Sequence, residues 1–198
     1  MRRVHPIETE SYRILRGMVD LSHLGPLSRA VAERVIHASA DLEYAQSLVL
    51  DEAALERGIE ALRRDTPIVT DVGMVAAGIT GRETQCFLSD PRGLSGSLGI
   101  TRSAAGFRLA AEEVGRGAIW VVGNAPTALF ELLDLNATPV LVIGLPVGFV
   151  GAAESKAALA TSGMPAITNQ GPKGGSAVAA AALNALIYYQ EEWNETDG

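Results

Sequence analysis

The 198-residue sequence lacks the features that mark several classes of protein. Cys86 is its only cysteine, so we expect no intrachain disulfide and a reducing compartment, the cytoplasm. No apolar stretch follows Arg2 and Arg3, so no secretory signal is expected. The most apolar run, Ala177–Tyr189, contains Asn184 and is too short to cross a membrane. The net charge of −7 argues against nucleic acid as a partner.

Motifs for cofactors and metals are absent or incomplete. The run Gly148–Gly151 resembles part of a dinucleotide fingerprint, but the G-x-G-x-x-G spacing fails and no ribose-binding acid follows it. The run Gly171–Ser176 lacks the spacing of a Walker A loop. The separations of His5, His23 and His37 do not make a metal site. We therefore expect no metal and no cofactor, and an enzyme that uses a nucleotide is the weaker alternative.

What the sequence does contain is a change of pattern at Thr66. The first 65 residues have apolar residues at helical spacing, with one helix over Pro6–Met18 and further helices that begin at the capping residues Ser28 and Asp51. Val31, Val35 and Leu42 would share a face of the second helix. After Thr66, β-rich runs alternate with helical stretches, which is typical of βαβ units. The expected strands are Pro67–Val72, Gln85–Leu88, Ala118–Val122, Pro139–Ile143 and Pro165–Thr168. The expected helices are Thr101–Val114, Pro126–Leu135, Ala152–Ala160 and Gly175–Tyr189.

The pattern predicts one α/β domain over residues 1–198, with a mostly parallel, Rossmann-like sheet flanked by helices and a helical N-terminal segment. Ser89–Gly99 is rich in glycine and serine and is expected to be a mobile surface loop, and the polar tail Gln190–Gly198 is expected to fray. Aromatic residues make up only 5% while alanine is abundant, which favours closely packed helices.

The sequence is organised around Pro139–Lys156, in which an apolar strand leads through a glycine-rich loop into a helix. Loops that follow parallel strands emerge on the same edge of the sheet, where α/β proteins bind ligands. The other loops of this kind contain Asp71, Asn124 and the segment Asn169–Ser176. We therefore expect a crevice faced by several helix N-termini, although a plain strand-to-helix connection would also use glycines.

Three cationic side chains lie close to this expected crevice. Arg102 follows the capping residue Thr101 and can form a fork with a carboxylate, and Lys173 lies in a loop with free backbone N–H groups before a helix. Lys156 is within one helical turn of the central loop. Each has an alternative interpretation, a solvated charge beside an ordinary helix cap.

His37 differs from the other two histidines because it lies late in a helix, beside the buried face. A lone histidine in such a place is more often structural. It is also the side chain whose ordinary titration range suits proton transfer near neutral pH, so both interpretations stay open.

Five runs of the sequence together resemble the precorrin-8X methylmutase family, also called cobalt-precorrin-8X methylmutases. The resemblance covers nearly the whole chain, from Ser11 to Leu186. The runs are RVIHAS at Arg34–Ser39, TRSAAG at Thr101–Gly106, GNAPTAL at Gly123–Leu129, PVGFVGAAESK at Pro146–Lys156 and GGSAVAAAALNAL at Gly174–Leu186. The sequence departs from the family pattern at Val72-Gly73 and at Pro172-Lys173.

The resemblance implies an isomerase of cobalamin biosynthesis that moves a methyl group from carbon 11 to carbon 12 of the corrin macrocycle, giving hydrogenobyrinate or cobyrinate. It implies no methyl donor, and a homodimer with the tetrapyrrole near the subunit interface. His37 matches the catalytic histidine, Ser11 a serine that touches substrate, and Arg102 the arginine of the TRSAA run. Together with the crevice, this gives the expected substrate-binding residues Ser11, Thr101, Arg102, Ser103, Asn124, Gly148 and Lys173.

The sequence is also compatible with two rival functions. A tetrapyrrole carrier of the same fold would keep the anion-binding loops without needing His37 for chemistry. A nucleotide-using enzyme is disfavoured by the failed fingerprints. The sequence leaves open whether the substrate carries cobalt and whether the pathway is aerobic or anaerobic.

Overall fold

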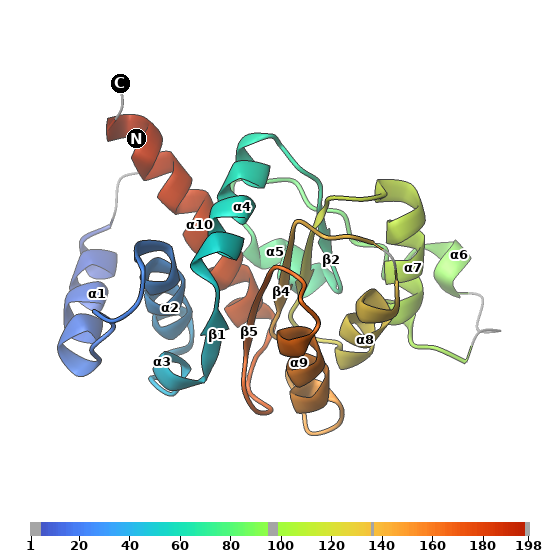
Figure 1. The fold of residues 1–198 in the computed structure, drawn as a ribbon, viewed down its shortest axis with the longest axis horizontal. Coiled ribbons are helices and arrows are strands. Elements are labelled where there is room, and N and C mark those ends of the chain that lie inside the picture. The colour runs from blue at the N-terminus through green and yellow to red at the C-terminus, as the bar shows by residue number, and fades with distance from the viewer. Residues whose placement is uncertain (1–4, 95–98, 136, 197–198) are drawn as a thin grey trace.

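A five-stranded sheet lies at the centre of the computed structural model, which describes residues 5–94, 99–135 and 137–196. The strand order is β1-β5-β4-β3-β2, with the neighbours among β2 to β5 parallel and β1 antiparallel to β5 at one edge (Figure 1). The predicted mostly parallel α/β sheet is therefore confirmed. The strands are β1 (Leu48–Leu50), β2 (Ile68–Thr70), β3 (Ile119–Val122), β4 (Leu141–Gly144) and β5 (Ala166–Asn169).

Helices cover both faces of this sheet, as the two separate hydrophobic clusters show. Two short helices, α3 (Tyr44–Ser47) and α6 (Pro91–Leu94), lie in connections. On one side lie α1 (Pro6–Met18), α2 (Pro26–Ser39), α4 (Glu52–Arg63), α5 (Gly73–Gly78) and α10 (Ser176–Thr196). On the other side lie α7 (Arg102–Val114), α8 (Pro126–Asp134) and α9 (Ala152–Thr161).

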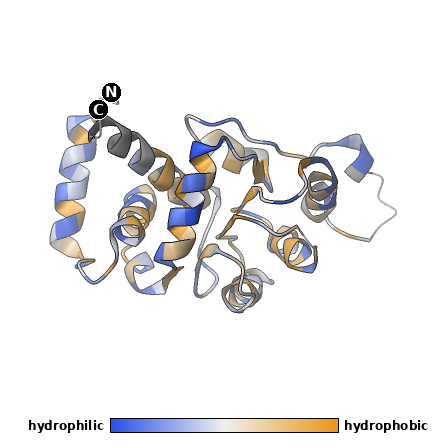
Figure 2. Ribbon diagram, turned by 45° about the horizontal axis from the view of Figure 1, so that its top comes forward, coloured by the Kyte–Doolittle hydropathy of each residue, from blue (hydrophilic) through white to orange (hydrophobic). Residues whose placement is uncertain are grey.

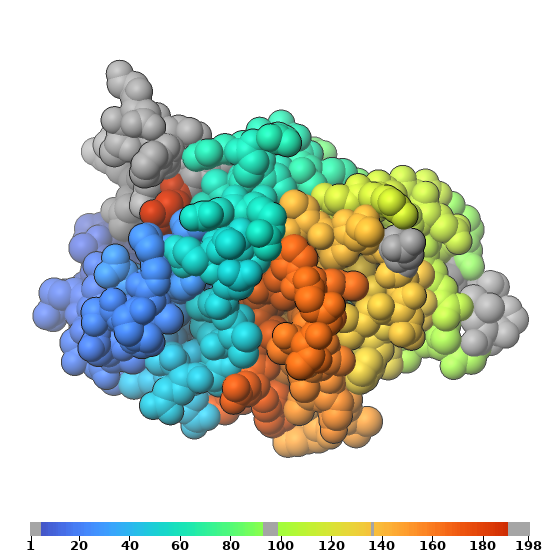
Figure 3. Space-filling model, in the orientation of Figure 1, coloured from blue at the N-terminus to red at the C-terminus, as the bar shows by residue number. Residues whose placement is uncertain are grey.

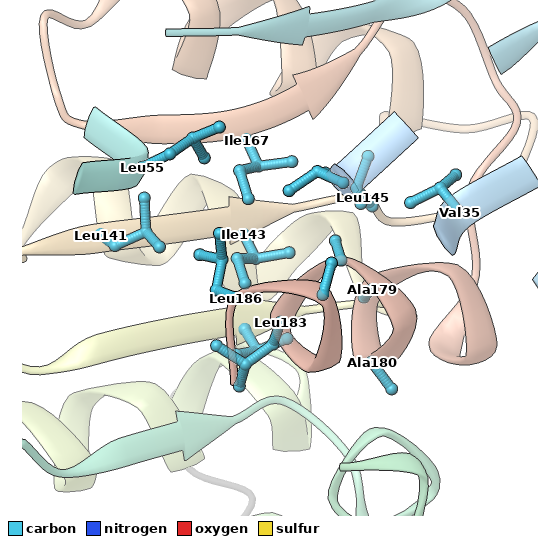
Figure 4. Packing of buried hydrophobic residues seen from close by; sticks show 14 of the residues in the cluster. Val35, Leu55, Leu141, Ile143, Leu145, Ile167, Ala179, Ala180, Leu183 and Leu186 are labelled. Carbon is cyan, nitrogen blue, oxygen red and sulfur yellow. The ribbon is translucent and has the colours of Figure 1, made fainter. Parts of the chain in front are cut away.

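The strands fill both layers because successive side chains point to opposite faces. Ile119 and Val121 belong to the cluster around α10, whereas Trp120 and Val122 belong to the cluster under α7 and α8. Figure 4 shows α10 close against β4, near Ile143. In Figure 2 the helices around the sheet carry hydrophobic and hydrophilic residues on different sides, as partly exposed helices do.

The start of α2 differs from the prediction. Ser28 is not its cap, because the N-cap is Gly25 and Pro26 opens the helix. The carboxylate of Glu52 takes over the capping role: it accepts the N–H groups of Leu27 at 2.8 Å and Ser28 at 3.0 Å, and the Ser28 hydroxyl at 2.5 Å. A partner from another helix therefore satisfies the free N–H groups that a local side chain usually caps.

Asp51 does cap its helix, since its side chain accepts the N–H of Ala53 at 3.1 Å. The expectation that the first 65 residues are helical is wrong at β1, because three apolar residues are too few to show a period. Helix α2 ends at Ser39, so Leu42 lies outside it.

Other boundaries also differ. Gln85–Leu88 is not a strand of the sheet; Gln85 forms only an isolated bridge with Val69. The sequence interpretation missed α5 and α6, both too short for a periodic pattern. Ser89–Gly99 contains α6, and part of it lies outside the described residues. The backbone of α10 continues to Thr196, beyond the predicted end at Tyr189. No helix in the described ranges is long and apolar enough to cross a membrane.

Candidate active site

At the carboxyl ends of the parallel strands, the loop that follows β2 contacts the loop that follows β3. Asp71, 1% exposed, accepts the backbone N–H groups of Gly123 at 3.1 Å, Asn124 at 2.8 Å and Ala125 at 2.8 Å. Burial raises the pKa of Asp71, and the three N–H donors act against that rise. The contacts fix the loop that carries Asn124. The sequence predicts that Asp71 lies in a loop at this edge of the sheet, but it does not predict that Asp71 binds the backbone of the neighbouring loop.

A cavity of about 400 Å³ opens beside this loop. The Thr101 side chain caps α7 by accepting the N–H of Ala104 at 3.3 Å, and its hydroxyl lies 2.7 Å from that of Thr127. Arg102 is exposed and makes no hydrogen bond or ion pair with the described residues. Its guanidinium is thus available to an anion. The cavity is lined by Thr101, Arg102, Ser103 and Asn124, together with Val72, Leu88, Ala125, Pro126 and Thr127.

His37 lies in the last turn of α2 and is partly exposed. Its Nδ1 is 2.8 Å from Oγ of Ser11 on α1, and the donor depends on the imidazole tautomer. The Tyr12 ring is stacked on the imidazole, with 4.9 Å between centroids and 15° between planes. Two predicted residues 26 positions apart therefore meet across two helices. Tyr12 was missed, although it directly follows Ser11.

Ion pairs hold α1 against α2 around this histidine. Arg34 donates to Glu8 at 2.6 Å and to the Tyr12 hydroxyl at 3.2 Å, and both side chains of the Arg34–Glu8 pair are largely buried. Arg16 forms a fork with Glu33, with distances of 2.8 Å and 2.7 Å. The bidentate pair fixes the Arg16 guanidinium, which lies 5.8 Å from the centroid of the Tyr12 ring. Because Arg34 also holds the Tyr12 hydroxyl, the ring beside His37 is held in place.

Lys173 is engaged within the protein. Its Nζ lies 2.6 Å from Asp41 and 2.8 Å from Glu43, and the hydrogen bonds to these two carboxylates raise the pKa of Lys173. Its contact with substrate stays a prediction. The expectation that Lys156 reaches the crevice is wrong, because its side chain is fully buried.

Gly148 lies between the two groups of predicted residues along the sheet edge. Its φ of 147° is one that other residues rarely adopt, and its N–H donates to the carbonyl of Pro172 at 3.2 Å. The same loop exposes Phe149 (99%) and Val150 (88%). In Figure 3 the orange surface of the C-terminal half lies between the cyan surface of the N-terminal part and the yellow surface around α8.

Six of the eight predicted residues thus form two clusters. Ser11 and His37 form the α1–α2 cluster, and Thr101, Arg102, Ser103 and Asn124 line the α7 cavity. The loop of Gly148 and the Lys173 loop lie against each other. Among the described residues, no group of three or more His, Cys, Asp or Glu side chains is arranged to hold a metal ion.

A model of one protein family matches this chain over residues 6–189, and its description is precorrin-8X methylmutase. The chain belongs to the precorrin-8X methylmutase family. It is therefore an enzyme, an isomerase of cobalamin biosynthesis, as the resemblance predicted. The alignment spans the N-terminal helices, the α7 cavity and all five strands, so both clusters lie within the family domain.

Relatives of known name agree with this membership. The chain is 44% identical to the cobalt-precorrin-8 methylmutase of Salmonella typhimurium, over 94% of this chain and 95% of that protein. It is 40% identical to the precorrin-8X methylmutase of Sinorhizobium, over the same shares. A crystal structure of precorrin-8X methylmutase from Thermus thermophilus has a TM-score of 0.87 at 36% identity, covering 96% of this chain and 99% of that one.

Proposed function

We propose that this methylmutase moves a methyl group from carbon 11 to carbon 12 of precorrin-8X or its cobalt counterpart, with His37 as the general acid. The product is hydrogenobyrinate or cobyrinate. The observation that carries the proposal is the 2.8 Å contact between His37 Nδ1 and Ser11 Oγ, which orients the imidazole in a partly exposed position.

In this proposal each ring nitrogen of His37 has its own role. In the protonated ring both nitrogens donate, so Nδ1–H is held by Ser11 Oγ and Nε2–H is left for the substrate. Protonating the conjugated macrocycle near ring C draws electrons towards that site. The methyl group then leaves carbon 11 with its bonding electrons and forms a bond to carbon 12. Because substrate and product are isomers, neutral His37 takes the proton back at Nε2.

The α7 cavity supplies the anchor in this proposal. The substrate carries several acetate and propionate carboxylates, whereas the protein has a net charge of −7, so binding depends on local donors. Arg102 is exposed at the first turn of α7, where the positive end of the helix adds to its charge. Thr101, Ser103 and Asn124 line the same cavity.

The test of the proposal is turnover of metal-free and cobalt-loaded substrate in parallel. A change of the visible spectrum reports the methyl shift, because it alters the conjugated system. We expect turnover of at least one of the two substrates, and the faster one identifies the natural form. Tight binding of both without any spectral change would contradict the proposal and favour a carrier.

The proposed enzyme acts in the cytoplasm as a homodimer, with the substrate near the subunit interface. The support is apolar surface beside the site: Phe149 and Val150 are almost fully exposed, and Phe130 lies against the same loop at Gly151. Large exposed apolar patches mark interaction sites.

Light scattering at micromolar concentration should give a dimer, and Phe149→Glu should give a monomer. Ile7→Glu, at a residue that is also exposed, is the control and should stay dimeric. A monomeric wild type would contradict this part.

A further inference from the structure

The sequence has only two lysines, Lys156 and Lys173, and a hydrogen bond joins the side chain of Lys156 to the backbone of Lys173. Lys156 lies on α9 with a fully buried side chain. Its Nζ donates to Oδ1 of Asn169 at 3.0 Å and to the backbone carbonyl of Lys173. No carboxylate among the described residues pairs with it. Burial lowers the pKa of Lys156 to about 8, which shows the cost of an ammonium group in this place.

Stability alone does not explain a lysine in this position. A methionine has a similar length and fills the same volume without desolvating a charge. Replacing buried charges by apolar residues of similar volume is often neutral or stabilising. The gain from Lys156 must therefore lie in the groups that it holds.

Those groups belong to the loop Gln170–Gly175, between β5 and α10. Asn169 Nδ2 donates to the carbonyls of Gln170 at 3.1 Å and Lys173 at 3.0 Å. Lys156 and Asn169 therefore both donate to the backbone carbonyl of Lys173. On its other side the loop accepts the N–H of Gly148 at its Pro172 carbonyl. The fit is tight at Gly174, where a Cβ would lie 2.3 Å from the carbonyl oxygen of Leu145.

The far side of this loop reaches the helix of His37. The Lys173 side chain pairs with Asp41 and Glu43, which directly follow the C-terminal end of α2. A continuous set of contacts therefore runs from Lys156, through the backbone of the loop, to the turn beside His37. The same loop contacts Gly148 in the glycine-rich loop after β4.

We propose that Lys156 is a positioning residue: together with Asn169 it holds the loop Gln170–Gly175 in the conformation that sets the end of α2, and hence His37, relative to the Gly148 loop. The inference rests on the proposed function only for its activity readout. A displacement of about 1 Å at a site can cost up to 100-fold in rate, so a loosened loop is expected to reduce turnover strongly.

Two lysines in the sequence make a direct structural test possible. Labelling with [13Cε]lysine gives one NMR signal for each lysine. In Lys156→Met the remaining signal, from Lys173, should move towards that of a free, solvated lysine, because its ion pairs are no longer held in register. Turnover at saturating substrate should fall about tenfold or more. The melting temperature should be unchanged or higher.

Two further variants complete the experiment. Lys156→Gln keeps a hydrogen-bond donor, so it should restore part of the turnover and part of the Lys173 signal; it also replaces Lys156→Met if that variant does not fold. Lys173→Met removes the ion pairs that connect the loop to the end of α2 while Lys156 still holds the loop, so its turnover should fall by about as much as that of Lys156→Met. An unchanged Lys173 signal in Lys156→Met together with wild-type turnover would overturn the inference. If the wild type has no methylmutase activity, the proposed function fails, and the NMR signal alone decides the inference.

Discussion

The α1–α2 cluster around His37 and the α7 cavity around Arg102 are built in different ways. In the α1–α2 cluster, side chains contact side chains: Ser11 with His37, Tyr12 on the imidazole, and Arg34 with Tyr12. Around the α7 cavity the backbone sets the geometry. Three N–H groups bind Asp71, and the first turn of α7 presents Arg102. The first arrangement orients the imidazole that we propose as the proton donor, and the second presents donors to an anion. We infer that chemistry and anchoring are divided between them.

The largest effect is expected from His37→Ala, which removes the proposed proton donor of the α1–α2 cluster. A positioned general acid contributes about two to four orders of magnitude in rate. Turnover should therefore fall at least about 100-fold, while the dissociation constants of substrate and product stay near those of the wild type. Single-turnover kinetics and a binding titration measure the two quantities. Near-normal turnover would mean that His37 has a structural role and that the α1–α2 cluster does not carry the chemistry.

A smaller effect, on affinity instead of rate, is expected from Arg102→Ala in the α7 cavity. A charge-assisted hydrogen bond is worth about 1.5 to 3 kcal/mol, which corresponds to a product affinity about 10- to 100-fold lower. Added salt should weaken binding to the wild type more than to the variant, because one charged contact is missing. Arg108→Ala, on the exposed side of the same helix, is the control. An unchanged product affinity would remove Arg102 from the site.

The next effect concerns stability and pH at Lys156. Its pKa is about 8 in the folded protein, below the ordinary value of 10.5, so the unfolded chain binds more protons between these two values. The cost of the buried charge is constant below pH 8 and is relieved as the pH rises. The free energy of unfolding of the wild type, relative to Lys156→Met, should therefore increase between pH 8 and 10 by on the order of 2 kcal/mol. Urea titrations at several pH values measure it.

Lys173→Met is the control for that measurement. The pKa of Lys173 is raised by its carboxylate partners, so its stabilising effect is fully present below the ordinary lysine value and is lost only at higher pH. Its difference from the wild type should stay flat over the same window. A flat difference for Lys156→Met as well would mean that Lys156 is not desolvated in the folded protein.

The smallest effect is expected from Ala40→Gly at the end of α2. Ala40 has a φ of 52°, in the left-handed region that glycine adopts without strain. The substitution should stabilise the protein by about 1 kcal/mol, seen as a higher melting temperature. A decrease in turnover together with this gain would show that a rigid end of α2 matters for His37. Destabilisation would show that the surroundings favour Ala40 as it is.

Parts of this structure follow from the sequence and others do not. The parallel strands and the loops at their carboxyl ends are predictable, because apolar runs ending in Gly, Asn or Asp have few other interpretations. The meeting of Thr101 and Arg102 with Asn124 follows from that topology. The pairing of Ser11 with His37 does not, since it depends on how two helices cross. The family resemblance implies a role for each of the two residues, but it does not predict their contact.

The wrong predictions for Ser28 and Lys156 share a physical cause. In both, a residue far away in the sequence makes the contact that a local group was expected to make. Serine is a common helix-capping residue, but Glu52 from another helix, and not Ser28, caps α2. Lysine is usually a surface residue, but hydrogen bonds to Asn169 and to the carbonyl of Lys173 hold the Lys156 side chain in the interior. No local pattern carries such contacts between segments far apart in the sequence.

The division between the two clusters is tested most directly by the double variant His37→Ala/Arg102→Ala beside the two single variants. Single-turnover rates at saturating substrate and product dissociation constants are measured for all four proteins. If the clusters act independently, Arg102→Ala weakens product binding by the same factor with or without His37, and His37→Ala slows turnover by the same factor with or without Arg102. A factor that changes with the state of the other residue would contradict the division of chemistry and anchoring between the α1–α2 cluster and the α7 cavity.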